Sequence, residues 1–251
     1  MQQPQIPEPF NLIALDTVGS TNTEAKSRAD DGIDAAPDFT LIWAKEQTAG
    51  KGRRGRSWTS PPGNLYTSII LRPDAPVAEL SAYSFIAAVA VVEALEDFSP
   101  TSHQIHCKWP NDALVNGKKV AGILMETASG DSSRAKWLVV GMGLNVETYP
   151  QDTAYPATSL NVEGWDTSVE AILGRYCERF LHWSRAWEAE GFDAVRRTWL
   201  AHGIGQGEPI RVSLGDGDVA GIFEDVDETG ALIINEAGTR RRITAGDVFF
   251  W

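Results

Sequence analysis

Short apolar stretches separated by glycine, proline and polar residues recur through the first 150 residues. Their length and their boundaries at turn-forming residues favour strands over helices. The predicted strands are Phe10–Asp16, Phe39–Lys45, Leu65–Arg72, Gln104–Trp109, Ala113–Val115, Val120–Thr127 and Lys136–Val146. Asn116 and Gly117, between two of these strands, are typical of a two-residue hairpin turn.

Helical patterns lie between these strands and again beyond residue 168. The predicted helices are 22–31, Val77–Phe98, Val169–Glu190 and Phe192–His202. Thr21 and Glu24 have the spacing of a capping box, which marks the start of the first helix. The second is rich in alanine and valine, so we expect it to be buried in the core. The last two are amphipathic.

After Gly203 the pattern changes to short apolar stretches interrupted by glycines, which predicts a small β-barrel. We therefore divide the chain into a main domain at 1–203 and a small domain at 204–251. Gly141 and Gly143 interrupt the last strand of the main domain. Glycines within a strand indicate either a bulge or a ligand lying against the backbone.

Composition and charge narrow the class of protein. The chain has 251 residues, of which 43% are hydrophobic and 22% charged, as in ordinary globular proteins. Its longest apolar run, Phe85–Val92, is far shorter than the ~20 residues that cross a bilayer. The amino terminus does not resemble a secretory signal. We expect no membrane segment and a cytoplasmic location.

Several kinds of chemistry are disfavoured by the residues present. Cys107 and Cys177 have no CxxC spacing, the four histidines have no metal-ligand spacing, and no Gly-x-Ser-x-Gly motif occurs. The sequence therefore predicts neither a protein-held metal nor a hydrolase triad. The net charge of -12 opposes nucleic-acid binding, since that depends on many phosphate contacts.

One basic loop stands out in this acidic chain. Between Gln47 and Trp58 it places Lys51, Arg53, Arg54 and Arg56 among three glycines. Four unpaired cations repel one another, and the glycines disfavour a regular helix. A solvated surface loop is the alternative interpretation. We expect a mobile loop that folds over a phosphate or carboxylate ligand.

The loop matches the residue patterns of two nucleotide-binding motifs but not the structural context that they require. Gly50, Gly52 and Gly55 fit Gly-x-Gly-x-x-Gly, and 50–57 fits a P-loop with Arg56 in place of lysine. Each motif requires a helix immediately afterwards to cradle phosphates. Pro61 and its neighbours Pro62 and Gly63 will not begin a helix, so both folds are rejected.

A second basic position lies in Lys108–Asp112, where a lysine ends a predicted strand. Together with four other motifs in order along the chain, it resembles the catalytic domain of biotin protein ligases. The matching segments are Gln47–Trp58, Gly63–Tyr66, Lys108–Asp112, Lys119–Leu124 with Glu126, and Gly141–Val146. The resemblance implies an α+β fold: a biotin/lipoate ligase-like domain with a mixed, largely antiparallel sheet, then an SH3-like β-barrel.

The resemblance also implies a reaction and its cofactors. Biotin's carboxylate attacks magnesium ATP to give biotinyl-5'-adenylate, and a lysine of a biotin carboxyl carrier protein then takes the biotin. Arg53 and Lys108 are the implied catalytic residues. The implied biotin-binding residues are Ser20, Thr21, Asn22, Gln47, Gly50, Lys51, Gly52, Arg53, Lys108 and Gly122. The implied ATP- or adenylate-binding residues are Arg53, Arg54, Arg56, Trp58, Asn111, Lys119 and Asn145.

Some positions keep an alternative. Lys51 stands where the family usually has arginine, Thr21 suits helix capping, and Trp58 suits a core. A lipoate or octanoate protein ligase or acyltransferase of the same fold is the alternative enzyme, and a non-catalytic nucleic-acid-binding module the remote one. About ten residues precede Phe10–Asp16, so we expect the monofunctional form without an amino-terminal DNA-binding domain.

Overall fold

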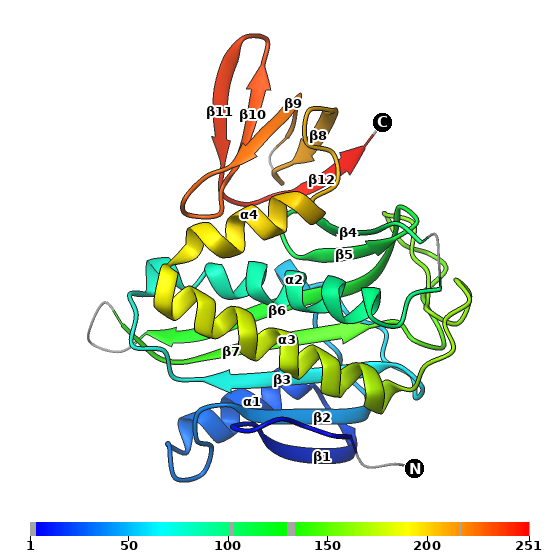
Figure 1. The fold of residues 1–251 in the computed structure, drawn as a ribbon, viewed down its shortest axis with the longest axis vertical. Coiled ribbons are helices and arrows are strands. Elements are labelled where there is room, and N and C mark those ends of the chain that lie inside the picture. The colour runs from blue at the N-terminus through cyan, green and yellow to red at the C-terminus, as the bar shows by residue number, and fades with distance from the viewer. Residues whose placement is uncertain (1–3, 101–102, 130–133, 216, 251) are drawn as a thin grey trace.

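The computed structural model describes residues 4–100, 103–129, 134–215 and 217–250. Its main element is a seven-stranded sheet in the order β1-β2-β3-β7-β6-β5-β4 (Figure 1). The strands are β1 (Asn11–Val18), β2 (Thr40–Gln47), β3 (Leu65–Leu71), β4 (Ile105–Lys108), β5 (Asp112–Val115), β6 (Lys118–Ser129) and β7 (Ala135–Leu144). β1 pairs with β2 in parallel and the other pairs are antiparallel, which confirms the expected mixed sheet.

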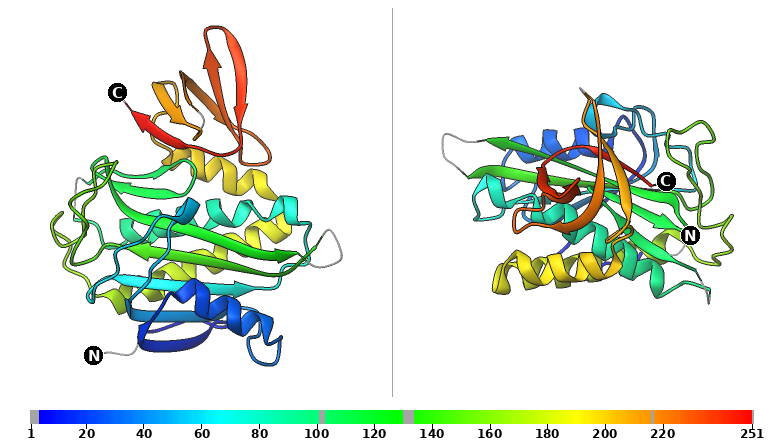
Figure 2. Two further views of the ribbon diagram at one scale, coloured as in Figure 1. Left: turned by 180° about the vertical axis from the view of Figure 1, so that it is seen from behind. Right: turned by 90° about the horizontal axis from the view of Figure 1, so that it is seen from above.

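Successive side chains of a strand point to opposite faces of the sheet, and here both faces carry apolar residues. In β2, Leu41 and Trp43 belong to the large core cluster while Ile42 belongs to a second, smaller one. Helices α2 (Ala82–Glu96), α3 (Val169–Glu190) and α4 (Phe192–His202) cover the first face. Helix α1 (Thr21–Asp30) covers the other, as the view from above in Figure 2 shows.

Helix α2 is the central helix of the core. The predicted helix Val77–Phe98 begins as a short 3₁₀ turn, Val77–Glu79, and becomes α-helical only at Ala82. Among the described residues, Val77–Glu96 is the one helix whose length and hydropathy would suit a membrane span, and 67% of that window is buried inside the fold. Its apolar surface therefore packs against the sheet and α3, as expected of a core helix.

The predicted capping box at α1 is wrong. The helix begins at Thr21, one residue earlier than predicted, and Ser20 occupies the N-cap without a side-chain cap hydrogen bond. The Thr21 hydroxyl instead donates to Gln47 Oε1 at 3.1 Å, at the end of β2. The polar residues that begin this helix are thus directed into a tertiary contact.

The hairpin at Asn116 and Gly117 is confirmed, since both have positive φ and join the antiparallel strands β5 and β6. The antiparallel strands β4, β5 and β6 also position the predicted catalytic lysine. Lys108 ends β4 and pairs in register with Asp112, which begins β5. The predicted strand end is therefore confirmed.

Beyond Gly203 the chain forms a separate antiparallel sheet in the order β11-β10-β9-β8-β12. Its strands are β8 (Pro209–Ser213), β9 (Asp218–Val226), β10 (Leu232–Glu236), β11 (Thr239–Ile243) and β12 (Asp247–Phe250). The Trp109 indole donates to the Gly230 carbonyl at 3.0 Å and so ties the turn before β10 to the main domain. The division at 203/204 and the SH3-like closure stay predictions.

Candidate active site

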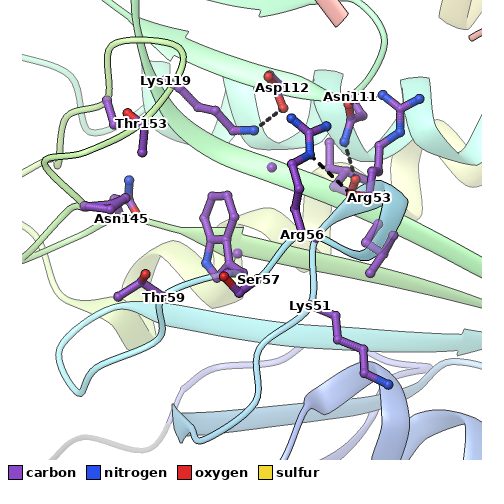
Figure 3. Close-up of a pocket in the computed structure, with 18 of the residues that line it drawn as sticks. Lys51, Arg53, Arg56, Ser57, Thr59, Asn111, Asp112, Lys119, Asn145 and Thr153 are labelled. Carbon is purple, nitrogen blue, oxygen red and sulfur yellow. Dashed lines mark hydrogen bonds and ion pairs between the residues drawn. The ribbon is translucent and has the colours of Figure 1, made fainter. Parts of the chain in front are cut away.

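The predicted site residues meet at a cavity of about 490 Å³, within the range of small-molecule sites. Its walls come from the start of α1, the end of β2, the basic loop, the β4–β5 turn, strands β6 and β7, the segment after β7, and β12. Figure 3 shows part of the lining, with Asn111, Asp112, Lys119 and Asn145 among the labelled residues. The lining includes Ser20, Thr21, Asn22, Gln47, Lys51, Gly52, Arg53, Arg56, Trp58, Lys108, Asn111, Lys119, Gly122 and Asn145. Which ligand each of these contacts stays a prediction.

Two predicted residues, Gly50 and Arg54, are not part of this lining. A Cβ on Gly50 would lie 2.3 Å from the carbonyl oxygen of Trp58, so this glycine allows the two arms of the loop to approach closely. Arg54 has a φ of 54°, and its guanidinium reaches Asp247 at 3.7 Å. In this structure both residues therefore shape the loop from outside the cavity.

A polar network fills one end of the cavity. Gln47 Oε1 accepts from the Thr21 amide at 2.8 Å, and Gln47 Nε2 donates to the Ser60 hydroxyl at 2.9 Å. Ser68 Oγ lies 2.8 Å from Thr21 Oγ1 and 2.6 Å from Asn22 Oδ1. These donors and acceptors are buried, or half-buried at Gln47, and are held by one another, which suits recognition of a small polar head group.

Asn22 extends the network to a carboxylate. Its amide donates to Glu126 at 2.9 Å, and the same carboxylate pairs with Lys26 at 2.5 Å. Burial raises the pKa of Glu126, but the hydrogen bonds from Lys26 and Asn22 outweigh it and lower the pKa overall. A Cβ on Gly141 would lie 2.0 Å from Asn22 Oδ1, so only glycine leaves room for this side chain.

Lys108 is the most deeply buried cation of the cavity, with 4% of its surface exposed. Its ammonium lies 3.5 Å from Asp112 Oδ2, and Lys119 lies 2.6 Å from the other carboxylate oxygen. Burial lowers the pKa of Lys108, and Asp112 opposes that shift. The Tyr155 ring covers the ammonium, with its centroid 4.3 Å from Nζ. The lysine is thus fixed on two sides.

Trp58 lies on a floor made by two glycines of neighbouring strands. A Cβ on Gly143 would be 2.5 Å from the indole Nε1, and one on Gly122 would be 3.0 Å from Cζ3. Gly122 and Gly143 face each other in the β6–β7 register, and the irregularity of that pair lies at Ala128/Ser129 instead. The glycines in β7 therefore do not form a bulge but make room for side chains.

Asn145 beside this floor is 2% exposed and lines the cavity. Its amide donates to the Thr158 carbonyl at 3.0 Å, whereas its Oδ1 has no hydrogen-bond partner. The indole Nε1 of Trp58 is also buried without one. Because buried polar atoms are normally paired, the unpaired acceptor of Asn145 at the cavity suits a hydrogen bond from a polar ligand.

The basic loop is a compact turn. Lys51 and Ser57 form an isolated antiparallel β-bridge, and the Gly52 amide donates to the Arg56 carbonyl at 2.7 Å. Between them, Arg53–Gly55 form one 3₁₀ turn. The mobile connection expected from the sequence folds back on itself. The next element along the chain is strand β3, which agrees with the rejection of both nucleotide-binding motifs.

The expectation of four unpaired cations in this loop is also wrong. Arg53, Arg54 and Arg56 approach Asp247 of β12 at 4.0, 3.7 and 3.0 Å. Arg53 also donates to Asn111 Oδ1 at 3.0 Å. Lys51 is directed away from the labelled arginines in Figure 3, toward α1. The cations are therefore divided between two sides of the loop.

Comparison with known proteins decides the family. Residues 15–145 match the biotin/lipoate A/B protein ligase family, and residues 206–251 match the biotin protein ligase C-terminal domain. The chain belongs to the biotin/lipoate A/B protein ligase family. The match confirms the family suggested by the motifs.

Members of this family resemble the chain over nearly its whole length. A Paracoccus denitrificans protein named biotin--[acetyl-CoA-carboxylase] ligase is 37% identical over 92% of this chain and 97% of its own. The biotin protein ligase of Aquifex aeolicus, solved with biotin and ATP, has a TM-score of 0.80 and 28% identity, covering 95% and 97%. That of Leishmania major, solved with biotinyl-5-AMP, has a TM-score of 0.63 and 26% identity, covering 94% and 100%. The α+β ligase fold is confirmed.

Tyr155 and Asp247 are among the residues of this ligase-family site that sequence reasoning missed. Tyr155 lies in a segment without regular structure, and Asp247 lies 191 positions beyond Arg56. An aromatic or acidic residue in such places gives no local signal of function. The one available signal was the acidic excess of the chain: in a protein with a net charge of -12, the arginines of a single basic loop are expected to find a carboxylate to pair with.

Proposed function

We propose that this protein activates biotin with ATP and transfers it to a lysine of a carrier protein. The protein is an enzyme, a biotin ligase. The observation that carries the proposal is the meeting of three features in one cavity: a buried polar network, a buried lysine with arginines, and an unpaired amide oxygen beside an indole. These features suit the head group of biotin, the reacting acid and phosphate groups, and adenine.

The first step joins two anions. A carboxylate oxygen of biotin forms a bond to the α-phosphorus of ATP, the bond from that phosphorus to the bridging oxygen breaks, and pyrophosphate leaves with the electron pair. Two charges about 4 Å apart repel by ~1 kcal/mol in water and by several times more in a protein site. Lys108 and Arg53 offset this repulsion and stabilise the charge on the phosphorus oxygens.

The polar network suits the ureido group, which has two N–H donors and one carbonyl acceptor. Gln47, Thr21 and Asn22 offer both kinds of partner and are held in place by Ser60 and Ser68. The dithiolane ring of lipoate has no ureido group and cannot form comparable hydrogen bonds with this network. The polar network therefore supports biotin over lipoate as the substrate.

The adenine end is proposed at Asn145 and Trp58. The unpaired Oδ1 of Asn145 suits the exocyclic amino group of adenine, which donates hydrogen bonds. The half-buried indole, over which Lys119 Nζ lies 5.4 Å from the ring centroid, offers an aromatic surface for stacking. Asn111, predicted to bind the nucleotide, uses both ends of its amide within the protein, on Arg53 and the Ile123 carbonyl. We propose that it positions Arg53.

Magnesium does not fit as a protein-held ion. Nucleotide-bound magnesium uses one or two carboxylates with phosphate oxygens. Three acids line the cavity among the described residues: Asp112 is paired with two lysines, Asp247 lies among three arginines, and Asp152 is exposed. The described residues contain no group of three or more acidic, histidine or cysteine side chains that could hold a metal ion. We propose that the ion arrives with the triphosphate.

In the second step the amine of a lysine attacks the carbonyl carbon of biotinyl-5'-adenylate, an amide bond forms and AMP leaves. The proposed acceptor is a biotin carboxyl carrier protein. The proposed location is the cytoplasm, in keeping with Cys107 and Cys177, which are free and buried.

The direct test is to incubate the protein with magnesium ATP and either biotin or lipoate, and to detect the acyl-adenylate by mass spectrometry. We expect biotinyl-5'-adenylate and no lipoyl-adenylate. Adding a carrier domain should then increase the carrier's mass by one biotinyl group on one lysine. Lipoyl-adenylate in place of the biotinyl compound would reject the substrate, and neither product would reject the reaction.

A further inference from the structure

One carboxylate of the C-terminal sheet gathers three guanidinium groups of the basic loop. Asp247 begins β12, and its oxygens lie 4.0, 3.7 and 3.0 Å from Arg53, Arg54 and Arg56. The shortest of these contacts is also a hydrogen bond. Asp247, Arg53 and Arg56 line the cavity described above. A residue of the small sheet is therefore part of the wall of the proposed active site.

The charges in this contact are unequal. Three guanidinium groups meet a single carboxylate, and Arg53 finds its other partner in the neutral amide of Asn111. The group keeps an excess of positive charge. A phosphate chain with several negative charges satisfies such a group better than one carboxylate does, because each guanidinium can then take its own oxygens. Asp247 is thus an anion that a nucleotide can replace.

The loop that makes this contact holds one of its arginines in an uncommon backbone conformation. Arg54 has a left-handed φ of 54°, which residues other than glycine adopt only occasionally. All three guanidinium groups are partly exposed, with 22, 39 and 57% of the side chains of Arg53, Arg54 and Arg56 accessible. Without Asp247 nothing on the described part of the C-terminal sheet pairs with these arginines.

We propose that Asp247 is a positioning residue, an internal counter-anion that holds the arginine loop at the cavity until phosphate groups replace it. The proposal rests on the function proposed above, because it assigns the phosphates of ATP or pyrophosphate as the competing anions. It gives the C-terminal sheet a defined part in the first step. The small sheet supplies the charge that keeps the loop in place before the nucleotide binds.

The test uses Asp247→Asn, which keeps the shape of the side chain and removes its charge. We expect limited trypsin digestion of the ligand-free full chain to cut after Arg53, Arg54 or Arg56 several times faster in this variant, with fragments identified by mass spectrometry. We also expect inorganic pyrophosphate, titrated calorimetrically with EDTA present, to bind roughly fivefold more tightly, as the loss of one competing charge implies.

Two further variants keep the result interpretable. Asp247→Glu retains the carboxylate and should be cut as slowly as the parent protein, whereas a general loss of folding would accelerate cleavage in both variants. Asp218→Asn removes a different aspartate–arginine pair of the same sheet, to Arg211, and should change neither measurement. Unchanged loop cleavage in Asp247→Asn, or unchanged or weaker pyrophosphate binding, would overturn the proposal. The cleavage assay needs no biotin or ATP, so its result is independent of whether the acyl-adenylate forms.

Discussion

The indole of Trp58 lies so close to Gly143 that a Cβ on this glycine would be 2.5 Å from Nε1. Gly143→Ala should therefore push Trp58 off its floor. We expect ATP to bind about tenfold more weakly and the fold to lose about 1 to 3 kcal/mol, as overpacked sites do. Calorimetric titration with ATP and urea unfolding measure the two effects.

Gly217→Ala is the matched control for this change, because a Cβ there would meet nothing within 4 Å and the backbone φ is not positive. Normal ATP affinity in Gly143→Ala would show that the position of the indole does not matter to the nucleotide.

Lys108→Ala should damage the first step more than biotin binding, since its charge matters most as bonding at phosphorus changes. Loss of one preorganised donor lowers kcat by roughly 10²- to 10³-fold. Biotin-dependent exchange of pyrophosphate into ATP measures the step, and calorimetry measures biotin affinity. Lys118→Ala removes an exposed lysine of the β5–β6 hairpin and serves as control. Unchanged exchange would reject the catalytic role of Lys108.

Arg53→Ala removes the guanidinium that joins Asn111 to the cavity. A charge-assisted hydrogen bond of this kind contributes about 1.5 to 3 kcal/mol. We expect slower formation of the adenylate, faster release, or both, in rapid-quench and dissociation measurements. Arg53→Lys should restore little, because an ammonium lacks the planar fork.

The control for Arg53 is Arg185→Ala, an exposed arginine of α3. An Arg53→Ala enzyme that forms and retains the adenylate at the parent rates would contradict the assignment.

Tyr155 covers the ammonium of Lys108 with its ring. A cation–π contact of this kind contributes about 0.5 to 2 kcal/mol, so Tyr155→Ala should slow adenylation by roughly three- to thirtyfold. Tyr155→Phe keeps the ring and should stay near the parent rate. The comparison of the two variants in the pyrophosphate exchange assay is the test. Equal losses in both would assign the effect to the hydroxyl group instead.

The parts of the site that could be predicted from sequence are those encoded locally. The alternation along β2 and the Asn116-Gly117 turn define the sheet, and the meander places Lys108 at the end of β4. The motifs then indicate which residues line the cavity. In each case the signal spans only a few positions, within reach of periodicity and turn chemistry.

The contacts that could not be predicted join distant segments. Asp247 meets the basic loop only because the C-terminal sheet packs beside it, and no local pattern encodes that. The start of α1 was misplaced for a similar reason. Thr21 satisfied a capping rule in the sequence, but its hydroxyl finds a partner on β2, which only tertiary packing supplies.

Asp227 stabilises the turn that ties the C-terminal sheet to the main domain. Its carboxylate accepts hydrogen bonds from the amides of Thr229 and Ala231 at 2.9 Å each and pairs with Arg242 at 2.5 Å. Burial raises the pKa of Asp227, but these contacts outweigh it and lower the pKa from 3.8 to about 2. Because the folded-state pKa lies below the unfolded one, the stabilisation is present above pH 3.8 and is lost as the pH falls toward 2.

This shift corresponds to roughly 2 kcal/mol at neutral pH, of which roughly half remains near pH 3. Asp227→Asn should therefore lower the free energy of unfolding by about that amount near pH 6, and the difference from the parent protein should shrink near pH 3. Urea unfolding at both pH values measures it, with the exposed Asp34→Asn as control. A difference between Asp227→Asn and the parent that is the same at both pH values would show that the effect comes from lost packing and not from the charge of this carboxylate.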